Sequence, residues 1–305
     1  MKGSKLAIAD PMPLEHKEDE RPSVKELIET HRKRIERVKG ELSQYPLYVP
    51  SKHDDLWILR FVLSYKKTKP AVLAAKYTLV FRKEHSLDAE DLRPYPPVGG
   101  KTHPRGEALE EYNTYNEPGA IYCGLPDAKR GVIAYFDLKG INQQELAANL
   151  PEAHWLPTYL YLNEWCFQWN DYITRTTGRL TKMIRIADTE DVDLKKMLNG
   201  EAWKRDGRTM EIMEDCYPQL LEAGFIANAR EWFQVPWRII KPFLPKRVVS
   251  KTDFIAPAKN EKELQILLKY VDKKNLPKKF GGEYETWPVD YPVPPTGDSS
   301  AKSTT

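Results

Sequence analysis

The chain has 305 residues, of which 41% are hydrophobic and 11% aromatic, so it can form one large core together with a smaller helical lobe. Its 47 lysines and arginines nearly balance 44 acidic residues, and a net charge of +3 gives no indication of a nucleic-acid partner. No run of 18 apolar residues occurs, and the 3 cysteines form no CxxC pair. We therefore expect an intracellular, cytoplasmic protein without a transmembrane helix, a disulfide framework or a zinc ribbon.

The N-terminal part of the sequence is helical in pattern. Residues 1–20 show no periodicity and are expected to be a disordered tail. Ser23 and Glu26 form a capping box, and apolar residues then recur at helical spacing as far as Leu42. The basic outer face of this helix is either a solvated surface or a membrane-facing patch. Two more helices are predicted at residues 56–62 and 70–81, so residues 21–93 form an all-helical lobe.

Beyond the breaker-rich residues 93–104 the pattern changes to alternating strands and helices. A long helix carries a stripe of apolar residues that needs a sheet to cover, comprising Trp155, Tyr159, Leu162, Cys166, Trp169 and Ile173. The predicted strands are residues 120–123, 132–138, 182–187, 224–228 and 248–255. The later helices are residues 194–203, 208–221, 230–244 and 261–271. This order predicts an α/β domain over residues 94–286, followed by a disordered tail over residues 287–305.

Motifs of enzyme chemistry are absent from the sequence. It has no GxSxG elbow and no HExxH motif, and its 6 histidines never approach one another at metal-ligand spacing. We therefore expect neither catalysis nor a bound metal.

The sequence REWFQVPWRIIKPFL, residues 230–244, has an unusual pattern. Arg230, Gln234, Arg238 and Lys241 follow helical spacing and form one polar stripe, and nearly every other position is apolar. A helix that is apolar on both flanks cannot bury them all against one sheet face. Either another element covers the far side, or the helix closes a cavity and meets lipid.

Several segments in chain order resemble the signatures of the CRAL-TRIO family, the lipid-binding fold of phosphatidylinositol/phosphatidylcholine transfer proteins. They are YPQLLEAGFIAN (residues 217–228), KPFL (241–244), VVSKT (248–252) and NLPKKFGG (275–282). Upstream, LRF (59–61) resembles the family's helical-lobe motif, and KRG (129–131) with YF (135–136) resembles its first hairpin. The resemblance covers residues 21–287.

The resemblance implies a CRAL-TRIO fold, with a central, mixed, mostly parallel sheet flanked by helices and a gate helix over an apolar pocket. The gate would be residues 230–245, and its expected membrane-docking residues are Trp232, Phe233, Trp237, Lys241 and Phe243. The protein would bind one lipid, most simply a phospholipid such as phosphatidylinositol, and transfer it while associating transiently with membranes. It would need no cofactor besides that lipid. The alternatives are a sterol, isoprenoid or haem ligand in the same fold, and a regulatory scaffold without transfer.

The resemblance also carries expectations about individual ligand-binding residues. Members that bind phosphatidylinositol have a positively charged residue at the positions of Lys66 and Arg238. This sequence departs from their pattern at Tyr65, Gln219 and Val235. Hydroxyl groups that cradle choline in other members are replaced by Met183 and Arg185. A buried Arg185 needs an anion, either from the ligand or from Asp188. Tyr135 is the one candidate for a haem ligand. The expected lipid-binding residues are Tyr65, Lys66, Tyr135, Met183, Arg185, Tyr217, Gln219, Val235, Arg238 and Ile239.

Overall fold

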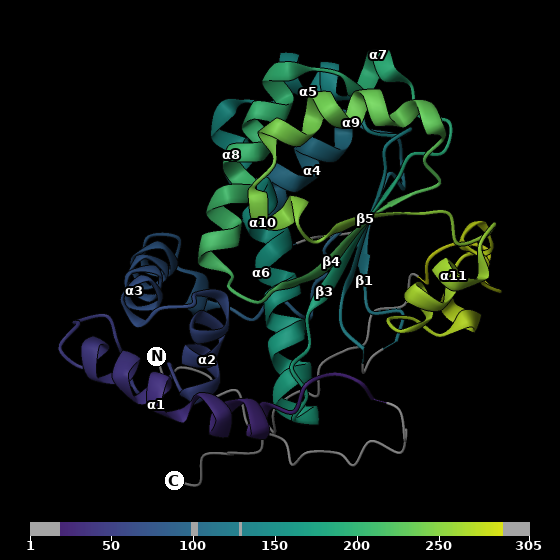
Figure 1. Ribbon diagram of the computed structural model, residues 1–305. Helices are drawn as coiled ribbons and strands as arrows, with labels where there is room; N and C mark the ends of the chain where they lie inside the picture. Colours follow the sequence, from purple (N-terminus) through teal and green to yellow (C-terminus); the bar gives the residue numbers. More distant parts are fainter. Residues whose placement is uncertain (1–18, 99–102, 128–129, 289–305) are drawn as a thin grey trace, which may run out of the picture.

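Three helices at the N-terminal end form a separate lobe (Figure 1), as the sequence predicts. The computed structural model describes residues 19–98, 103–127 and 130–288, so most of the expected N-terminal tail lies outside the described residues. The Oγ of Ser23 accepts a hydrogen bond from the Glu26 N–H at 3.3 Å, which confirms Ser23 as the N-cap of the first helix. The lobe consists of α1 (Val24–Leu42), α2 (Asp55–Ser64) and α3 (Thr68–Glu84).

The second part of the chain contains a single five-stranded mixed sheet, and the fold is α/β. The strands lie side by side in chain order; the first pair is antiparallel and the others are parallel. The predicted strand at 248–255 is wrong in its first half, because residues 246–249 form helix α10. The strands are β1 (Ile121–Gly124), β2 (Ile133–Asp137), β3 (Met183–Asp188), β4 (Leu221–Ala227) and β5 (Thr252–Ile255).

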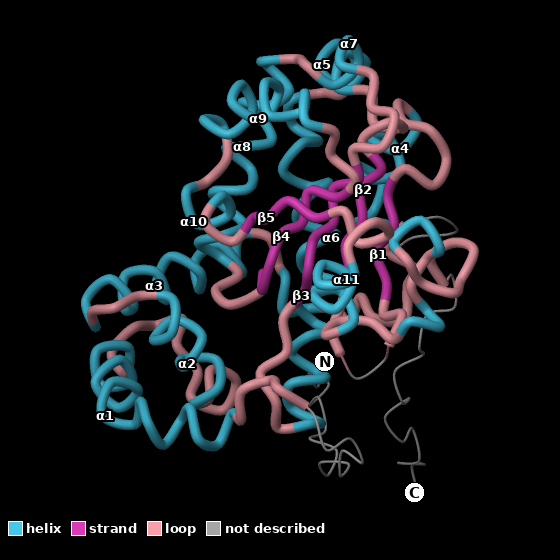
Figure 2. Tube along the Cα trace, turned by 45° about the vertical axis from the view of Figure 1, so that its right-hand side comes forward, coloured by secondary structure: helices cyan, strands magenta, loops and turns pink. Residues whose placement is uncertain are grey.

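Helices cover both faces of the sheet (Figures 1 and 2). The predicted stripe of α6 is buried in the main core, and α11 packs on the opposite face. The predicted helices at 194–203 and 208–221 have different boundaries, because α8 runs through Gly207 without a break. The remaining helices are α4 (Glu107–Thr114), α5 (Gln143–Asn149), α6 (Glu152–Thr177), α7 (Leu194–Met197), α8 (Gly200–Cys216) and α11 (Glu261–Leu268).

Trp287 belongs to the core and not to a tail, contrary to the sequence-based expectation. Its ring stacks on Tyr122 with the centroids 5.4 Å apart and also contacts the rings of Tyr135 and Phe280. These contacts lie on the face of the sheet that α11 covers. The aromatic area buried there explains why Trp287 is part of the core. Residues 289–305 lie outside the described residues.

Buried ion pairs fix the helical lobe to α6. The Arg82 guanidinium on α3 donates to both carboxylate oxygens of Glu164 at 3.1 and 3.0 Å. The Tyr217 hydroxyl donates to the same carboxylate at 2.8 Å, so this buried charge is fully hydrogen-bonded. Arg60 on α2 pairs with Asp171 at 3.0 Å. The lobe is therefore held by directional contacts as well as by apolar packing.

The gate segment, residues 230–245, is broken into short helical pieces. The sequence predicts one helix over residues 230–244, and that prediction is wrong. Pro242 has no N–H to donate to the preceding turn, and the chain changes there from an α-helix to a 3₁₀-helix. The pieces are η3 (Glu231–Phe233), α9 (Gln234–Ile240) and η4 (Lys241–Phe243), and they are followed by α10 (Lys246–Val249).

None of the helices in the described ranges combines the length and the hydropathy that crossing a bilayer requires.

Candidate functional site

A mostly apolar cavity of about 150 Å³ lies between the sheet, α6, α8 and the gate segment. It is smaller than the roughly 300–1,000 Å³ of typical ligand pockets. The cavity in this structure is therefore too small for a ligand as large as a two-chain lipid. The apolar lining residues include Phe136, Leu138, Leu162, Trp203, Met210, Phe225, Phe233, Trp237, Ile240 and Leu244.

The gate segment presents apolar side chains on both of its sides. Phe233, which is only 2% exposed, Trp237 and Ile240 line the cavity. Trp232, Val235 and Ile239 point outward and are 41%, 59% and 49% exposed. The spacing of three and four residues places these three on one helical face. The segment therefore lines a cavity with one side and exposes apolar side chains on the other.

Two charged side chains interrupt the apolar lining. Asp206 on α8 is 2% exposed and accepts hydrogen bonds from the Tyr159 hydroxyl at 2.6 Å and from the Gln143 amide at 3.1 Å. Burial raises the pKa of Asp206 to about 6, against the effect of these two hydrogen bonds. Arg185 on β3 is the second charged residue, and its Nη2 donates to Asn163 Oδ1 at 3.0 Å.

Replacing the Asp206 carboxylate with an amide is expected to stabilise the protein at neutral pH. With a folded-state pKa raised from 3.8 to about 6, ionisation of Asp206 destabilises the fold increasingly from about pH 4 to pH 6 and fully above. The expected gain for Asp206→Asn is about 3 kcal/mol at pH 7.5 and less than about 1 kcal/mol near pH 4. The unpartnered Gln143 Oε1 can accept from the new amide after a flip of the Gln143 side chain.

Urea unfolding of both proteins at the two pH values measures this difference. A gain of equal size at pH 4 and pH 7.5 would show that the Asp206 charge is not its source.

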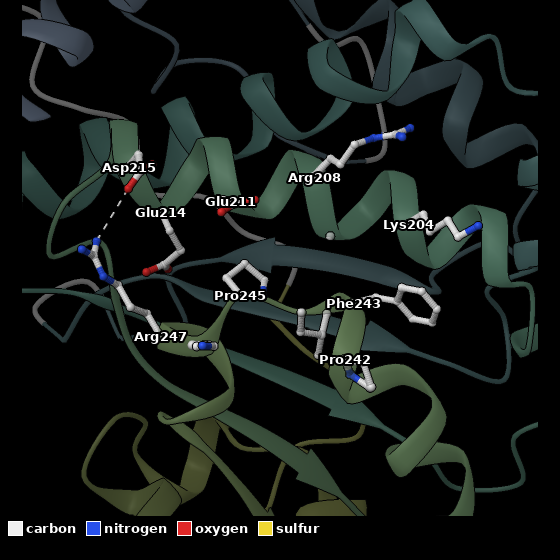
Figure 3. Close-up of a pocket in the computed structure, with 12 residues that line it drawn as sticks. Lys204, Arg208, Glu211, Glu214, Asp215, Pro242, Phe243, Pro245 and Arg247 are labelled. Carbon is white, nitrogen blue, oxygen red and sulfur yellow. Dashed lines mark ion pairs between the residues drawn. The ribbon is translucent and has the colours of Figure 1, made fainter.

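A second, charged groove of about 640 Å³ lies outside the cavity, between α8 and the end of the gate segment (Figure 3). Asp215 and Arg247 point toward each other across it, with 3.8 Å between Nη1 and Oδ1. The Arg247 guanidinium also lies over the Tyr65 ring, 4.6 Å from its centroid, and the Tyr65 hydroxyl donates to Asp215. These contacts join α10 to the helical lobe and to α8.

Gly207 is the position where the gate segment touches α8 most closely. A Cβ atom at Gly207 would overlap the carbonyl oxygen of Phe243 and lie 3.0 Å from its carbonyl carbon. No side chain larger than hydrogen fits between α8 and η4 in this closed arrangement. The glycine explains how η4 lies directly on the α8 backbone.

Among the ten expected lipid-binding residues, Arg185 lines the cavity. Tyr135 does not, because its side chain lies on the opposite face of the sheet, where its hydroxyl bonds Asp188 at 3.1 Å. Lys66 and Arg238 are both exposed, and α9 lies well away from the helical lobe in both views (Figures 1 and 2). One phosphate therefore cannot bridge Lys66 and Arg238 in this closed structure.

The other expected lipid-binding residues have contacts outside the cavity. Met183 is buried in the main core, and Tyr217 bonds Glu164. The Gln219 amide donates to Ser64 Oγ at 3.0 Å and so joins the sheet domain to the helical lobe. Val235 and Ile239 point outward.

The five expected docking residues divide into three groups. Trp232 and Lys241 are exposed, as a docking surface requires. Phe233 and Trp237 face the cavity, and the Trp237 ring meets Phe254 edge-on at 5.7 Å. Phe243 is half-buried in the charged groove between α8 and the end of the gate segment. The expectation that Phe233 and Trp237 belong to the outer surface is therefore wrong.

Apart from Arg185, sequence reasoning did not single out the polar residues of the cavity. Asp206, Gln143 and Tyr112 come from three different helices, and no sequence motif links them. Tyr159 was identified only as part of the buried stripe of α6. The available signal was an acidic residue on the inner side of an amphipathic helix, and it becomes informative only once the boundaries of α8 are known.

The chain matches the family model for the CRAL/TRIO domain over residues 116–282, which is more than half of its length. The chain belongs to the CRAL-TRIO family. It is thus a member of a family of lipid-binding and lipid-transfer proteins.

Individual relatives support the same assignment. The chain is 39% identical over 74 residues to the SEC14 cytosolic factor of Kluyveromyces lactis, which covers 24% of this chain and 23% of that protein. It is 35% identical over 97 residues to the phosphatidylinositol/phosphatidylcholine transfer protein SFH7 of Arabidopsis thaliana, covering 32% of this chain and 17% of that protein. The matches therefore span less than a quarter of either relative's length.

A solved structure shows the same fold over nearly the whole chain. The crystal structure of Sfh5 aligns with a TM-score of 0.53 and 16% sequence identity, over 90% of this chain and 91% of that one. This CRAL-TRIO chain therefore shares the helical lobe and the sheet domain with a known structure.

Proposed function

We propose that this protein binds one hydrophobic lipid in the cavity beneath the gate segment and transfers or presents it between membranes. The observation that carries the proposal is the two-sided gate segment. Its inner side chains, Phe233, Trp237 and Ile240, line an apolar cavity, and its outer side chains, Trp232, Val235 and Ile239, are exposed. A gate has this pattern because it must seal a pocket on one side and meet a membrane on the other.

A phospholipid is the proposed ligand class, and phosphatidylinositol is one of its members. The named relative SFH7 is a phosphatidylinositol/phosphatidylcholine transfer protein, and the gate segment of this chain has the surface for a membrane-facing step. Arg238 and Lys241 are exposed beside the outward apolar side chains, where they suit an anionic headgroup region. The protein would act without catalysis and without a cofactor, as a cytoplasmic carrier that associates transiently with membranes.

Vesicle-to-vesicle transfer tests this function. Donor vesicles carry fluorescent phosphatidylinositol, phosphatidylcholine or a sterol analogue, and the initial rate of each lipid's arrival in acceptor vesicles is measured with the delipidated protein. We expect phospholipid transfer at least tenfold above the spontaneous rate. Transfer of the sterol alone would show that the ligand is a sterol and not a phospholipid. A haem ligand would appear as visible absorbance in the purified protein. No transfer and no bound lipid would favour a scaffold and contradict the proposal.

A further inference from the structure

Arg185 is a cation in the wall of an apolar cavity with no acid beside it. It stands near the middle of β3, and its side chain reaches the cavity between the sheet and α6. Its Nη2 donates to the neutral Asn163 side chain at 3.0 Å, and its Nε is buried without a hydrogen-bond partner. Within the described ranges of the chain, no carboxylate oxygen lies within 4.0 Å of its nitrogens.

Asp188, the acid that the sequence offers as a partner, is engaged elsewhere. Side chains three residues apart on a strand point to opposite faces of the sheet, so Arg185 and Asp188 face different layers. The Asp188 carboxylate pairs with Lys279 Nζ at 2.7 Å and accepts from Tyr135 at 3.1 Å. Asn228 donates to its second oxygen at 3.1 Å.

Asp206, the acidic residue in the cavity wall, has its own hydrogen-bond partners. Tyr159 and Gln143 supply one hydrogen bond to each of its oxygens. Burial raises the pKa of Asp206 and these two bonds lower it, and Arg185 is not among the causes of the shift. Arg185 and Asp206 therefore form no ion pair with each other.

A guanidinium removed from water needs an anion, and its flat fork of N–H groups matches the oxygens of a carboxylate or a phosphate. We propose that Arg185 binds an oxyanion of the ligand, so that the lipid enters the cavity with its acid group toward the sheet and its hydrocarbon toward the gate segment. Phe225 on β4 and Phe233, Trp237 and Ile240 on the gate segment provide the apolar surface for that hydrocarbon. This inference rests on the proposed lipid-binding function and adds the chemical class of the bound group.

Three probes with the same C18 chain separate the possibilities. Oleate carries a carboxylate, oleyl phosphate carries a phosphate and oleyl alcohol is neutral. Binding to delipidated protein is measured by tryptophan fluorescence for the wild type, Arg185→Gln and a matched control, Arg37→Gln, which removes an exposed cation on α1 of the helical lobe.

We expect the wild type and Arg37→Gln to bind at least one of the two anions ten times or more tightly than oleyl alcohol. Arg185→Gln should lose that preference and still bind oleyl alcohol. The anion that binds more tightly identifies the oxyanion as carboxylate or phosphate. An unchanged preference in Arg185→Gln would overturn the assignment, and so would equal binding of all three probes by the wild type, although either result leaves lipid binding intact. Failure of the wild type to bind any probe would overturn the proposed function itself.

A second readout does not depend on the ligand. Because Arg185 is a half-buried charge without an acidic partner in the lipid-free protein, Arg185→Met should melt at the same temperature as the wild type or higher. Oleate or oleyl phosphate should then raise the melting temperature of the wild type more than that of Arg185→Met. A large loss of stability in lipid-free Arg185→Met would show that Arg185 has a structural role and overturn the inference.

Discussion

Replacing Trp232, Val235 and Ile239 together with alanine is expected to weaken vesicle binding about a hundredfold. The three side chains are 41%, 59% and 49% exposed on one face of the gate segment, so they contribute little to the core. Moving each partly exposed side chain into the headgroup boundary contributes roughly 1 kcal/mol, and about 3 kcal/mol corresponds to about a hundredfold in affinity. Sedimentation with vesicles of mixed neutral and anionic lipid measures the loss.

The matched control for this variant is the triple change Val49→Ala, Ile266→Ala and Tyr284→Ala. These side chains are 39%, 36% and 44% exposed and are scattered over other parts of the molecule. We expect the control to keep its vesicle affinity within about threefold, and both variants to keep their melting temperature within a few degrees. Equal losses of affinity in the two triple variants would rule out the gate segment as the docking surface.

Replacing Gly207 with alanine is expected to open the gate segment and to speed ligand release roughly tenfold or more. The added methyl group overlaps the carbonyl oxygen of Phe243, and backbone atoms cannot rotate away as a flexible side chain can. Alanine is also a better helix former than glycine by about 1 kcal/mol, so α8 keeps its shape and η4 is the element displaced. Overpacking of this kind costs about 1–3 kcal/mol, which corresponds to a shift of about 5- to 150-fold toward the open gate.

Gly200→Ala in the same helix is the control, because a Cβ at Gly200 meets no atom within 4 Å. Stopped-flow release of a fluorescent lipid and limited proteolysis within residues 230–245 report the position of the gate segment. Gly207→Ala should show both fast release and cleavage, whereas Gly200→Ala should behave as the wild type. Unchanged release in Gly207→Ala would mean that the contact between η4 and α8 does not hold the gate closed.

Local sequence patterns predict most of the scaffold. The capping box at Ser23 and Glu26 places the start of α1, and the apolar stripe of α6 identifies the helix that covers the sheet. These features depend on short-range periodicity and on hydrogen bonds within a few residues. The mixed sheet and the position of the gate segment follow from the order of these elements and from the family resemblance.

The interior of the site could not be predicted in the same way. Asp206 and Gly207 are poor helix formers, and the sequence-based helices stop on either side of them. In the structure both residues lie within α8. Asp206 lines the cavity, and Gly207 leaves room for the backbone of η4. The contact between Arg247 on α10 and the Tyr65 ring likewise could not be predicted, because it forms only when the sheet domain packs against the helical lobe.

Native mass spectrometry of the protein purified without detergent tests most directly the central claim, a lipid cavity closed by the gate segment. We expect one species heavier than the 35.3 kDa chain by the mass of a single lipid, and a return to the chain mass after extraction with organic solvent. In Gly207→Ala the bound fraction should fall, because an open gate releases its ligand during purification. Wild-type protein that carries only the chain mass, and that takes up no lipid when offered vesicles, would contradict the account.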